Sequence, residues 1–157
     1  MSPDANQTPE QLARDQIDKR LHAAGWRVQD KNALDFNAGL GVAVREYQTD
    51  IGPADYVLFV DRQAVGVVEA KPDRWGGHLT SGEEQSQGYA NAKLKWVANA
   101  EPLPFVYEST GQVTRFTNGR DPQPRSRELF TFHRPETLKA WAQAQQSLRA
   151  GIAALPA

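Results

Sequence analysis

The sequence predicts an α/β fold in which a central mixed β-sheet is flanked by helices. Two short stretches at 53–60 and 64–71 are rich in β-branched and aromatic residues, and the polar residues between them suggest a β-hairpin. A second strand pair is indicated at 104–108 and 113–117, turning near Gly111. Predicted helices stand before, between and after these strands, an arrangement typical of the α/β class.

The first helix is predicted from capping signals. Thr8 is suited to the N-cap, Pro9 to the first helical position and Gln11 to the capping-box position. Gly25 provides the C-terminal stop.

One face of this helix carries Glu10, Arg14, Ile17 and Leu21, whose positions project within about 60° of each other at 100° per residue. Glu10 therefore lies on the same side as the core contacts. Its ordinary explanation is an acid that interacts with the helix dipole in the first turn. A functional carboxylate is the alternative.

The remaining elements follow in chain order. They are a short extended piece at 26–28, a strand at 42–47, a helix from a capping box at 81–84 to about residue 98, a short strand at 129–132 and an amphipathic helix at 135–155.

A chain of 157 residues is long enough for one domain with its own core. We expect residues 1–7 to form a disordered tail and residues 8–157 to form a single domain. The absence of cysteine excludes disulfides and thiolate metal sites. The sequence lacks an 18-residue apolar stretch and a secretion signal, so we expect no membrane segment and a cytoplasmic location.

The net charge of −1 comes from 18 basic and 19 acidic residues. Free-standing nucleic-acid-binding domains usually carry a basic excess, so any contact with DNA has to be local or supplied by a partner. The sequence has no G-x-x-x-x-G-K-[ST] motif, and nucleotide hydrolysis is therefore not encoded here. His22, His78 and His133 are isolated, and we interpret each as a surface or loop residue.

Ionisable residues interrupt the apolar hairpin at its open end. Asp55 opens one stretch, while Glu69 and Lys71 end the next, and Glu69 follows Asp55 by 14 positions. Charged groups in such a place are costly unless they are paired or bound to a metal. We therefore look for a functional site at this end of the hairpin, where charged residues interrupt an apolar pattern.

The register of the hairpin decides whether the two acids meet. If 61–63 forms a three-residue loop, residue 60 pairs with 64, and Asp55 falls opposite Glu69 on the same face. A strict two-residue turn pairs residue 55 with 70 and sends the acids to opposite faces. We expect the odd loop or a bulge.

Two adjacent carboxylates repel each other and offer hard oxygen ligands, which suits a divalent cation such as Mg²⁺. The cation activates water and stabilises charge at a phosphodiester, and a lysine orients or deprotonates the nucleophile. An Asp/Glu/Lys ion-pair cluster at a sheet edge is the alternative. The hairpin context favours a functional site.

Several motifs occur together in a specific order and spacing. They are Glu10-x3-Arg14-x2-Ile17-Asp18-x2-Leu21 with Ala24-Gly25-Trp26, then Ala54-Asp55-Tyr56-Val57-Leu58, Val67-Val68-Glu69-Ala70-Lys71, Gln85-x3-Tyr89 and Pro104-Phe105-Val106-Tyr107. This set resembles the N-terminal nuclease domain of the restriction (R) subunit of type I restriction enzymes, within the PD-(D/E)xK superfamily. The resemblance runs from Glu10 to about Trp141 and implies a restriction-endonuclease-like fold.

The resemblance implies roles for individual residues. Asp55 and Glu69 match the metal ligands, Lys71 matches the catalytic lysine, and Glu10 matches an accessory acid that reaches the metal from the first helix. The superfamily pattern has Pro directly before Asp, whereas Ala54 intervenes here. Because proline is not a ligand, this departure affects only the local backbone.

Three further residues match the part of the family pattern that contacts DNA or supports the site. Gln85 and Tyr89 form the Q-x3-Y element on the predicted second helix, and Arg14 lies in the first. Gln85 also has an ordinary explanation, the capping of backbone groups, and for this residue alone we favour it.

The resemblance also implies a context. It implies Mg²⁺, with Mn²⁺ as a substitute, double-stranded DNA as substrate, and modification and specificity subunits as partners. In such proteins ATP is used only by a helicase-like translocase later in the same polypeptide. Because that translocase is absent here, we expect the chain to be a fragment of a larger R subunit or a truncated protein.

Two other functions stay open at this point. One is a non-catalytic module of the same fold that binds DNA or docks a partner subunit, which the neutral net charge mildly favours. The other is a stand-alone repair or recombination nuclease.

Overall fold

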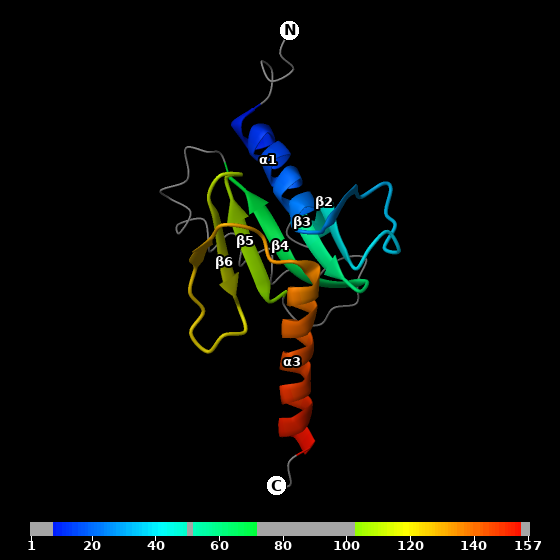
Figure 1. The fold of residues 1–157 in the computed structure, drawn as a ribbon, viewed down its shortest axis with the longest axis vertical. Helices are drawn as coiled ribbons and strands as arrows, with labels where there is room; N and C mark the ends of the chain where they lie inside the picture. Colours follow the sequence, from blue (N-terminus) through cyan, green and yellow to red (C-terminus); the bar gives the residue numbers. More distant parts are fainter. Residues whose placement is uncertain (1–7, 50–51, 72–102, 155–157) are drawn as a thin grey trace.

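The computed structural model describes residues 8–49, 52–71 and 103–154 (Figure 1). Within them, seven strands form one sheet, accompanied by the helices α1 and α3. The tail predicted at 1–7 and the helix predicted at 81–98 lie outside the described residues.

The strands follow one another across the sheet in chain order. The elements are α1 Pro9–Ala23, β1 Arg27–Asp30, β2 Gly41–Thr49, β3 Gly52–Val60, β4 Gln63–Ala70, β5 Phe105–Ser109, β6 Thr114–Asn118, β7 Arg127–Leu129 and α3 Pro135–Ala154. β1 pairs with β2, and β4 with β5, in parallel, whereas all other neighbours are antiparallel. The predicted mixed sheet is therefore confirmed.

The capping signals define α1 as predicted. The Thr8 side chain accepts a hydrogen bond of 3.1 Å from the backbone N–H of Gln11, and a proline stands at the start of the helix. The chain leaves the helix through Gly25, whose φ of 97° lies in the left-handed region that favours glycine.

The helix α1 and the beginning of α3 pack against the same face of the sheet, and α3 then extends beyond the strands (Figure 1). Ile17 and Leu21 of α1 and Leu138 of α3 are fully buried in one apolar cluster with the strands. The strand residues of this cluster include Tyr56, Leu58, Val68, Tyr107 and Phe116. A second cluster on alternate positions of the strands includes Val42, Val44, Val57, Phe59, Val67 and Val106. The sheet is thus buried on both faces.

The last strand begins and ends earlier than predicted, at Arg127 and Leu129. We expected a strand at 129–132, but β7 ends at Leu129. The chain then leaves the sheet, so that Phe130 is 97% exposed while Phe132 is buried. Phe132 packs against Tyr107, with ring centroids 5.4 Å apart, and this contact explains the departure.

His133 lies in the loop before α3, as predicted, but it is half-buried rather than on the surface. Its ring meets Phe116 and Trp141 edge to face, and its Nδ1 lies 2.7 Å from the Tyr107 hydroxyl. Burial, assisted by the positive charge of Arg127, lowers the pKa of His133 to about 4. His22 is exposed, as expected, and His78 lies outside the described residues.

Neither helix in the described part of the chain is long and apolar enough to cross a membrane.

Candidate active site

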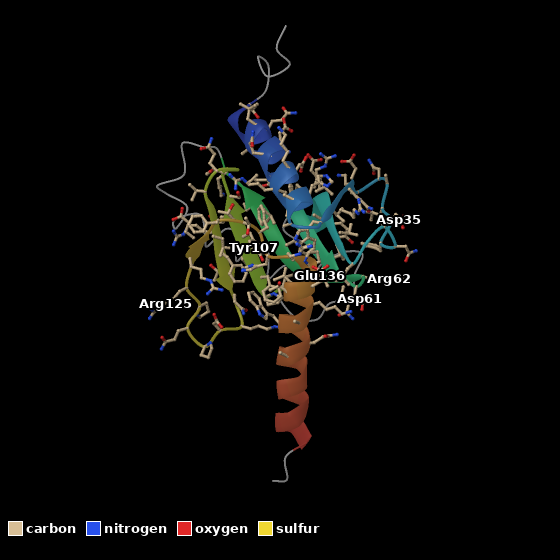
Figure 2. All side chains as sticks on the ribbon, in the orientation of Figure 1. Asp35, Asp61, Arg62, Tyr107, Arg125 and Glu136 are labelled. Carbon is tan, nitrogen blue, oxygen red and sulfur yellow. The ribbon has the colours of Figure 1, made fainter. Side chains whose placement is uncertain are left out.

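The hairpin of β3 and β4 closes with a tighter turn than the three-residue loop considered from the sequence. Val60 pairs with Gln63, so the turn contains only Asp61 and Arg62, both with positive φ, 50° and 68°. This conformation suits the twist of a two-residue hairpin turn. The turn lies near the beginning of α3, at the end of the hairpin away from the acids (Figure 2).

A bulge then corrects the register. Phe59 pairs with Ala64, but Leu58 pairs with Gly66, so Val65 is the extra residue. Pairing continues to Tyr56 and Val68, and the next positions bring Asp55 across from Glu69. The predicted bulge is confirmed and the three-residue loop is wrong. The two acids consequently share one face of the sheet.

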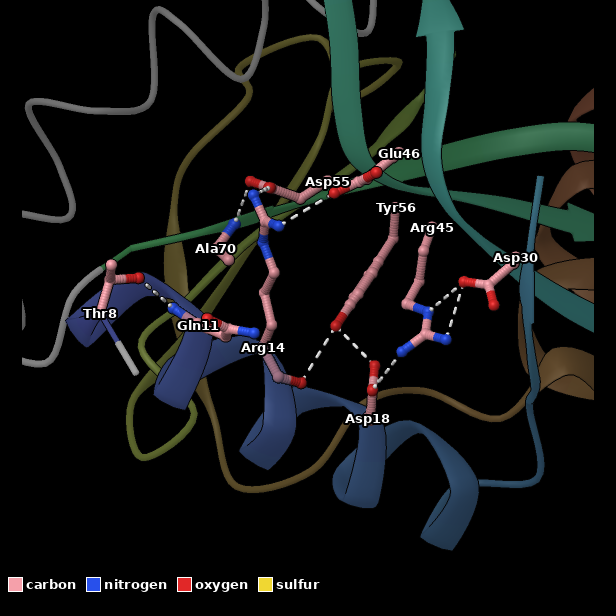
Figure 3. Close-up of polar contacts among 10 residues, drawn as sticks. All are labelled: Thr8, Gln11, Arg14, Asp18, Asp30, Arg45, Glu46, Asp55, Tyr56 and Ala70. Atoms are coloured by element: carbon pink, nitrogen blue, oxygen red, sulfur yellow. Dashed lines mark hydrogen bonds and ion pairs between the residues drawn. The ribbon is translucent and has the colours of Figure 1, made fainter. Parts of the chain in front are cut away.

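Both oxygens of Asp55 have partners (Figure 3). Its Oδ2 accepts a hydrogen bond of 2.9 Å from the backbone N–H of Ala70, and its Oδ1 lies 2.8 Å from Nη2 of Arg14. Nη1 of Arg14 lies 3.2 Å from Oε1 of Glu46. Arg14 therefore reaches from α1 to the strands and bridges two carboxylates.

Glu69 is more deeply buried than its partner, with an exposed fraction of 7%. Burial, followed by the negative charge of Asp55, raises the pKa of Glu69 to about 8, and the positive charge of Lys71 opposes the rise. Its Oε2 has no hydrogen-bond partner among the residues that the structure describes. A buried oxygen without a partner is costly, and such groups are explained by a catalytic role, by strain or by a bound water or ion.

Lys71 follows the last residue of β4 and is also buried. Its backbone N–H donates a hydrogen bond of 2.8 Å to the carbonyl of Ser109, which continues the pairing with β5 beyond the strand. The three predicted catalytic residues Asp55, Glu69 and Lys71 are therefore gathered at one end of the sheet.

Glu108 is a fourth ionisable residue at this place, and the sequence analysis missed it as a site residue. It is the register partner of Glu69 across β4 and β5, it is 4% exposed, and its charge contributes to the raised pKa of Glu69. The available signal was an acidic residue at the end of the apolar run of β5. A charged residue in such a place had already marked Glu69 as a candidate.

A second polar network, also missed, fastens α1 beside Asp55 (Figure 3). The buried Tyr56 hydroxyl lies 2.6 Å from Oδ1 of Asp18 and 3.0 Å from the backbone carbonyl of Arg14. Burial and the neighbouring Asp18 raise the pKa of Tyr56. Arg45 links Asp18, at 3.0 Å, to Asp30, at 2.8 Å. This network holds the helix that carries Arg14 against the strand that carries Asp55.

A polar cleft of about 270 Å³ opens between α1 and strands β1 to β3. Its lining is mainly charged and comprises Gln11, Arg14, Asp15, Asp18, Asp30, Arg45, Glu46 and Asp55. Asp55 therefore faces a space that reaches the surface.

The structure does not describe the side chains of three predicted site residues. Glu10 is the second residue of α1, but only its backbone is described, while Gln85 and Tyr89 lie outside the described residues. Their predicted roles stay predictions.

The site fits a hard divalent cation by its donor set. In the described part of the chain, no three acidic or histidine side chains are grouped to hold a metal ion. Asp55 and Glu69 supply two carboxylates, and Glu69 Oε2 has no partner there. Mg²⁺ typically takes one or two carboxylates and completes its shell with water and substrate phosphates, so two acids suffice.

The chain is similar to a subunit of a type I restriction enzyme. The type I restriction enzyme EcoKI endonuclease subunit of Escherichia coli (strain K12) is 28% identical over 179 residues, an alignment that covers 82% of this chain and 15% of that protein. The chain thus spans less than a fifth of that relative. The predicted relationship to type I restriction enzymes is confirmed.

A solved structure shares the fold. It is a fragment described as an HsdR subunit of a type I restriction enzyme from Vibrio vulnificus YJ016, with a TM-score of 0.60 and 20% identity. The match covers 85% of this chain and 25% of that one. The predicted α/β fold of the restriction-endonuclease-like kind is confirmed.

A sequence family model extends over most of the chain. The family described as the second domain of the type I restriction enzyme EcoKI endonuclease subunit matches residues 22–142. The chain belongs to this family.

Proposed function

We propose that this chain is the nuclease domain of a type I restriction enzyme R subunit and hydrolyses phosphodiester bonds of double-stranded DNA with Mg²⁺. The observation that carries the proposal is the bulge at Val65, which brings Asp55 and Glu69 to one face of the hairpin. Without that extra residue between the paired positions, the two carboxylates would face opposite sides of the sheet.

Asp55 and Glu69 are the proposed metal ligands. Asp55 presents its carboxylate at the polar cleft, and Glu69 offers the buried Oε2. When bound, Mg²⁺, or Mn²⁺ in its place, supplies a polarised water and stabilises charge at the phosphodiester. Glu10 is the proposed accessory acid, as the resemblance implies, and it lies one helical turn before Arg14.

Lys71 is the proposed group that orients or deprotonates the attacking water. Its backbone is fixed by the hydrogen bond to Ser109, and its charge acts on Glu69. Gln85 and Tyr89 are proposed to contact DNA or support the site, as the resemblance implies.

The proposed context is a restriction complex. The relatives are an EcoKI endonuclease subunit and an HsdR fragment, and this supports a type I enzyme over a stand-alone repair nuclease. In that context the partners are modification and specificity subunits, and ATP serves a translocase elsewhere in the polypeptide. A cytoplasmic location accords with this role.

Site variants test the proposed reaction in the assembled enzyme that carries this chain. Asp55→Asn and Glu69→Gln should each lower Mg²⁺-dependent cleavage of plasmid DNA by about a hundredfold or more, because each removes a ligand charge. Lys71→Met should lose turnover and keep metal binding. Asp61→Asn, in the exposed turn of the same hairpin, is the matched control and should cleave normally.

Undiminished cleavage by the double variant Asp55→Asn/Glu69→Gln would refute the proposed function. Wild-type protein that binds DNA without cleaving it, and shows no carboxylate-dependent metal site, would support a non-catalytic module instead.

A further inference from the structure

Arg14 places a positive charge beside one of the proposed metal ligands. Its guanidinium is 2.8 Å from Oδ1 of Asp55, one of the two acids proposed as metal ligands. The same guanidinium is 3.2 Å from Glu46 (Figure 3). A positive charge of the protein thus already neutralises one of the acids that a metal ion would use.

The two partners of Arg14 differ in burial. The side chain of Asp55 is 13% exposed, whereas that of Glu46 is 57% exposed. Arg14 itself is intermediate, at 35%. The guanidinium therefore bridges an inner carboxylate at the site and an outer one at the surface.

The backbone of Glu46 is unusual. Its φ of 54° is in the left-handed region, within strand β2. Its neighbours Arg45 and Tyr47 pair with Tyr56 and Ala54, so Glu46 lies across from Asp55. A non-glycine residue rarely adopts this conformation in a strand, and such exceptions cluster at functional sites.

We propose that Arg14 is the internal counter-cation of the metal site, an inference that rests on the proposed function. Arg14 neutralises Asp55 in the metal-free protein and competes with the divalent cation for this carboxylate. Glu46 is the outer partner that holds the guanidinium when the cation occupies the site. Arg14 is therefore a positioning residue that lowers the metal affinity.

The physical reason is charge repulsion. A divalent cation bound to Asp55 lies within a few ångströms of the guanidinium, and their repulsion is only partly screened in a half-buried site. If Arg14 instead served only to orient Asp55, its removal would weaken metal binding. The two roles therefore predict effects of opposite sign.

Mn²⁺ titration of the 157-residue chain, followed by electron paramagnetic resonance, distinguishes them. Arg14→Met keeps an apolar stem and removes the charge, and it should bind Mn²⁺ about tenfold more tightly than the wild type. Arg20→Met is the matched control, because Arg20 lies on the same helix with an intermediate exposure, but its guanidinium contacts the backbone carbonyl of Phe130 at 3.4 Å. It should change the affinity much less. Thermal unfolding of both variants reports on the fold.

A double-mutant cycle tests the part of Glu46. Glu46→Gln alone should weaken Mn²⁺ binding, since Arg14 then pairs with Asp55 only. In the Arg14→Met background the same change should have almost no effect on Mn²⁺ binding, because the guanidinium that Glu46 contacts is absent. Equal weakening in both backgrounds would show that Glu46 acts as a general surface charge and would contradict its proposed role.

Unchanged or weaker binding by a folded Arg14→Met variant would overturn the inference while the proposed function stands. If neither the wild type nor Arg14→Met has an Mn²⁺ site that Asp55→Asn removes, the proposed function itself fails, and the inference fails with it.

Discussion

Glu69 combines deep burial with a neighbouring carboxylate, and together they raise its pKa to about 8. An acid of raised pKa keeps its proton in the folded state at pH values at which the unfolded chain has already released it. The folded state then binds more protons, so the free energy of unfolding falls as pH rises. The window runs from the ordinary value of 4.5 to about 8.

Urea unfolding at a series of pH values, without divalent cations, tests whether the free energy of unfolding falls as pH rises. Between pH 5 and 8 the wild type should lose stability relative to Glu69→Gln, by at most about 4 kcal/mol, because glutamine cannot ionise. Glu46→Gln is the control, since Glu46 is exposed. A difference between wild type and Glu69→Gln that does not vary with pH would contradict the assigned burial effect.

In the hairpin of β3 and β4, the strands could be predicted from the sequence, but the turn that joins them could not. The two runs of β-branched and aromatic residues, with polar residues between them, were sufficient to predict both strands and two possible registers. The turn could not be chosen, because Asp61 and Arg62 adopt positive φ without the Asn-Gly or Asp-Gly pair that announces such turns. The bulge was therefore an alternative rather than a single prediction.

Gly66 follows the bulge residue and lets β4 approach β5 closely. A Cβ at this position would lie 2.5 Å from the carbonyl oxygen of Phe105, on the backbone of the neighbouring strand. Gly66→Ala should lower the free energy of unfolding by about 2 kcal/mol and disturb the register of Glu69. Gly119→Ala is the matched control, because its Cβ would lie 3.4 Å from the carbonyl oxygen of Pro104.

Denaturant unfolding of the two glycine variants measures this difference, with DNA cleavage or Mn²⁺ binding as the second measurement. Equal stability of both variants would show that the close approach of β4 and β5 is not a constraint on the sheet.

Across the whole molecule, the site draws on elements that are far apart in the sequence. Arg14 comes from α1, Glu46 from β2, Asp55 from β3 and Glu108 from β5. Local patterns predicted each of these elements but not their lateral contacts. The register of β4 against β5, which places Glu108 beside Glu69, has no local signal because the two strands are distant in sequence.

The helix α1 shows most clearly that the site depends on contacts between distant parts of the chain. The family match begins at residue 22, yet Arg14 and Asp18 of α1 contact Asp55 and Tyr56 of the hairpin. The helical periodicity placed Arg14 on the core-facing stripe and did not identify its partners. Tertiary packing of the helix against β3 determines them.

An anomalous difference map at the manganese absorption edge, from crystals of this chain soaked in Mn²⁺, tests most directly whether the two hairpin acids hold a cation. We predict one strong peak between Asp55 and Glu69, within about 2.3 Å of an oxygen of each. Full occupancy of other Mn²⁺ sites with no peak between these two carboxylates would contradict the account.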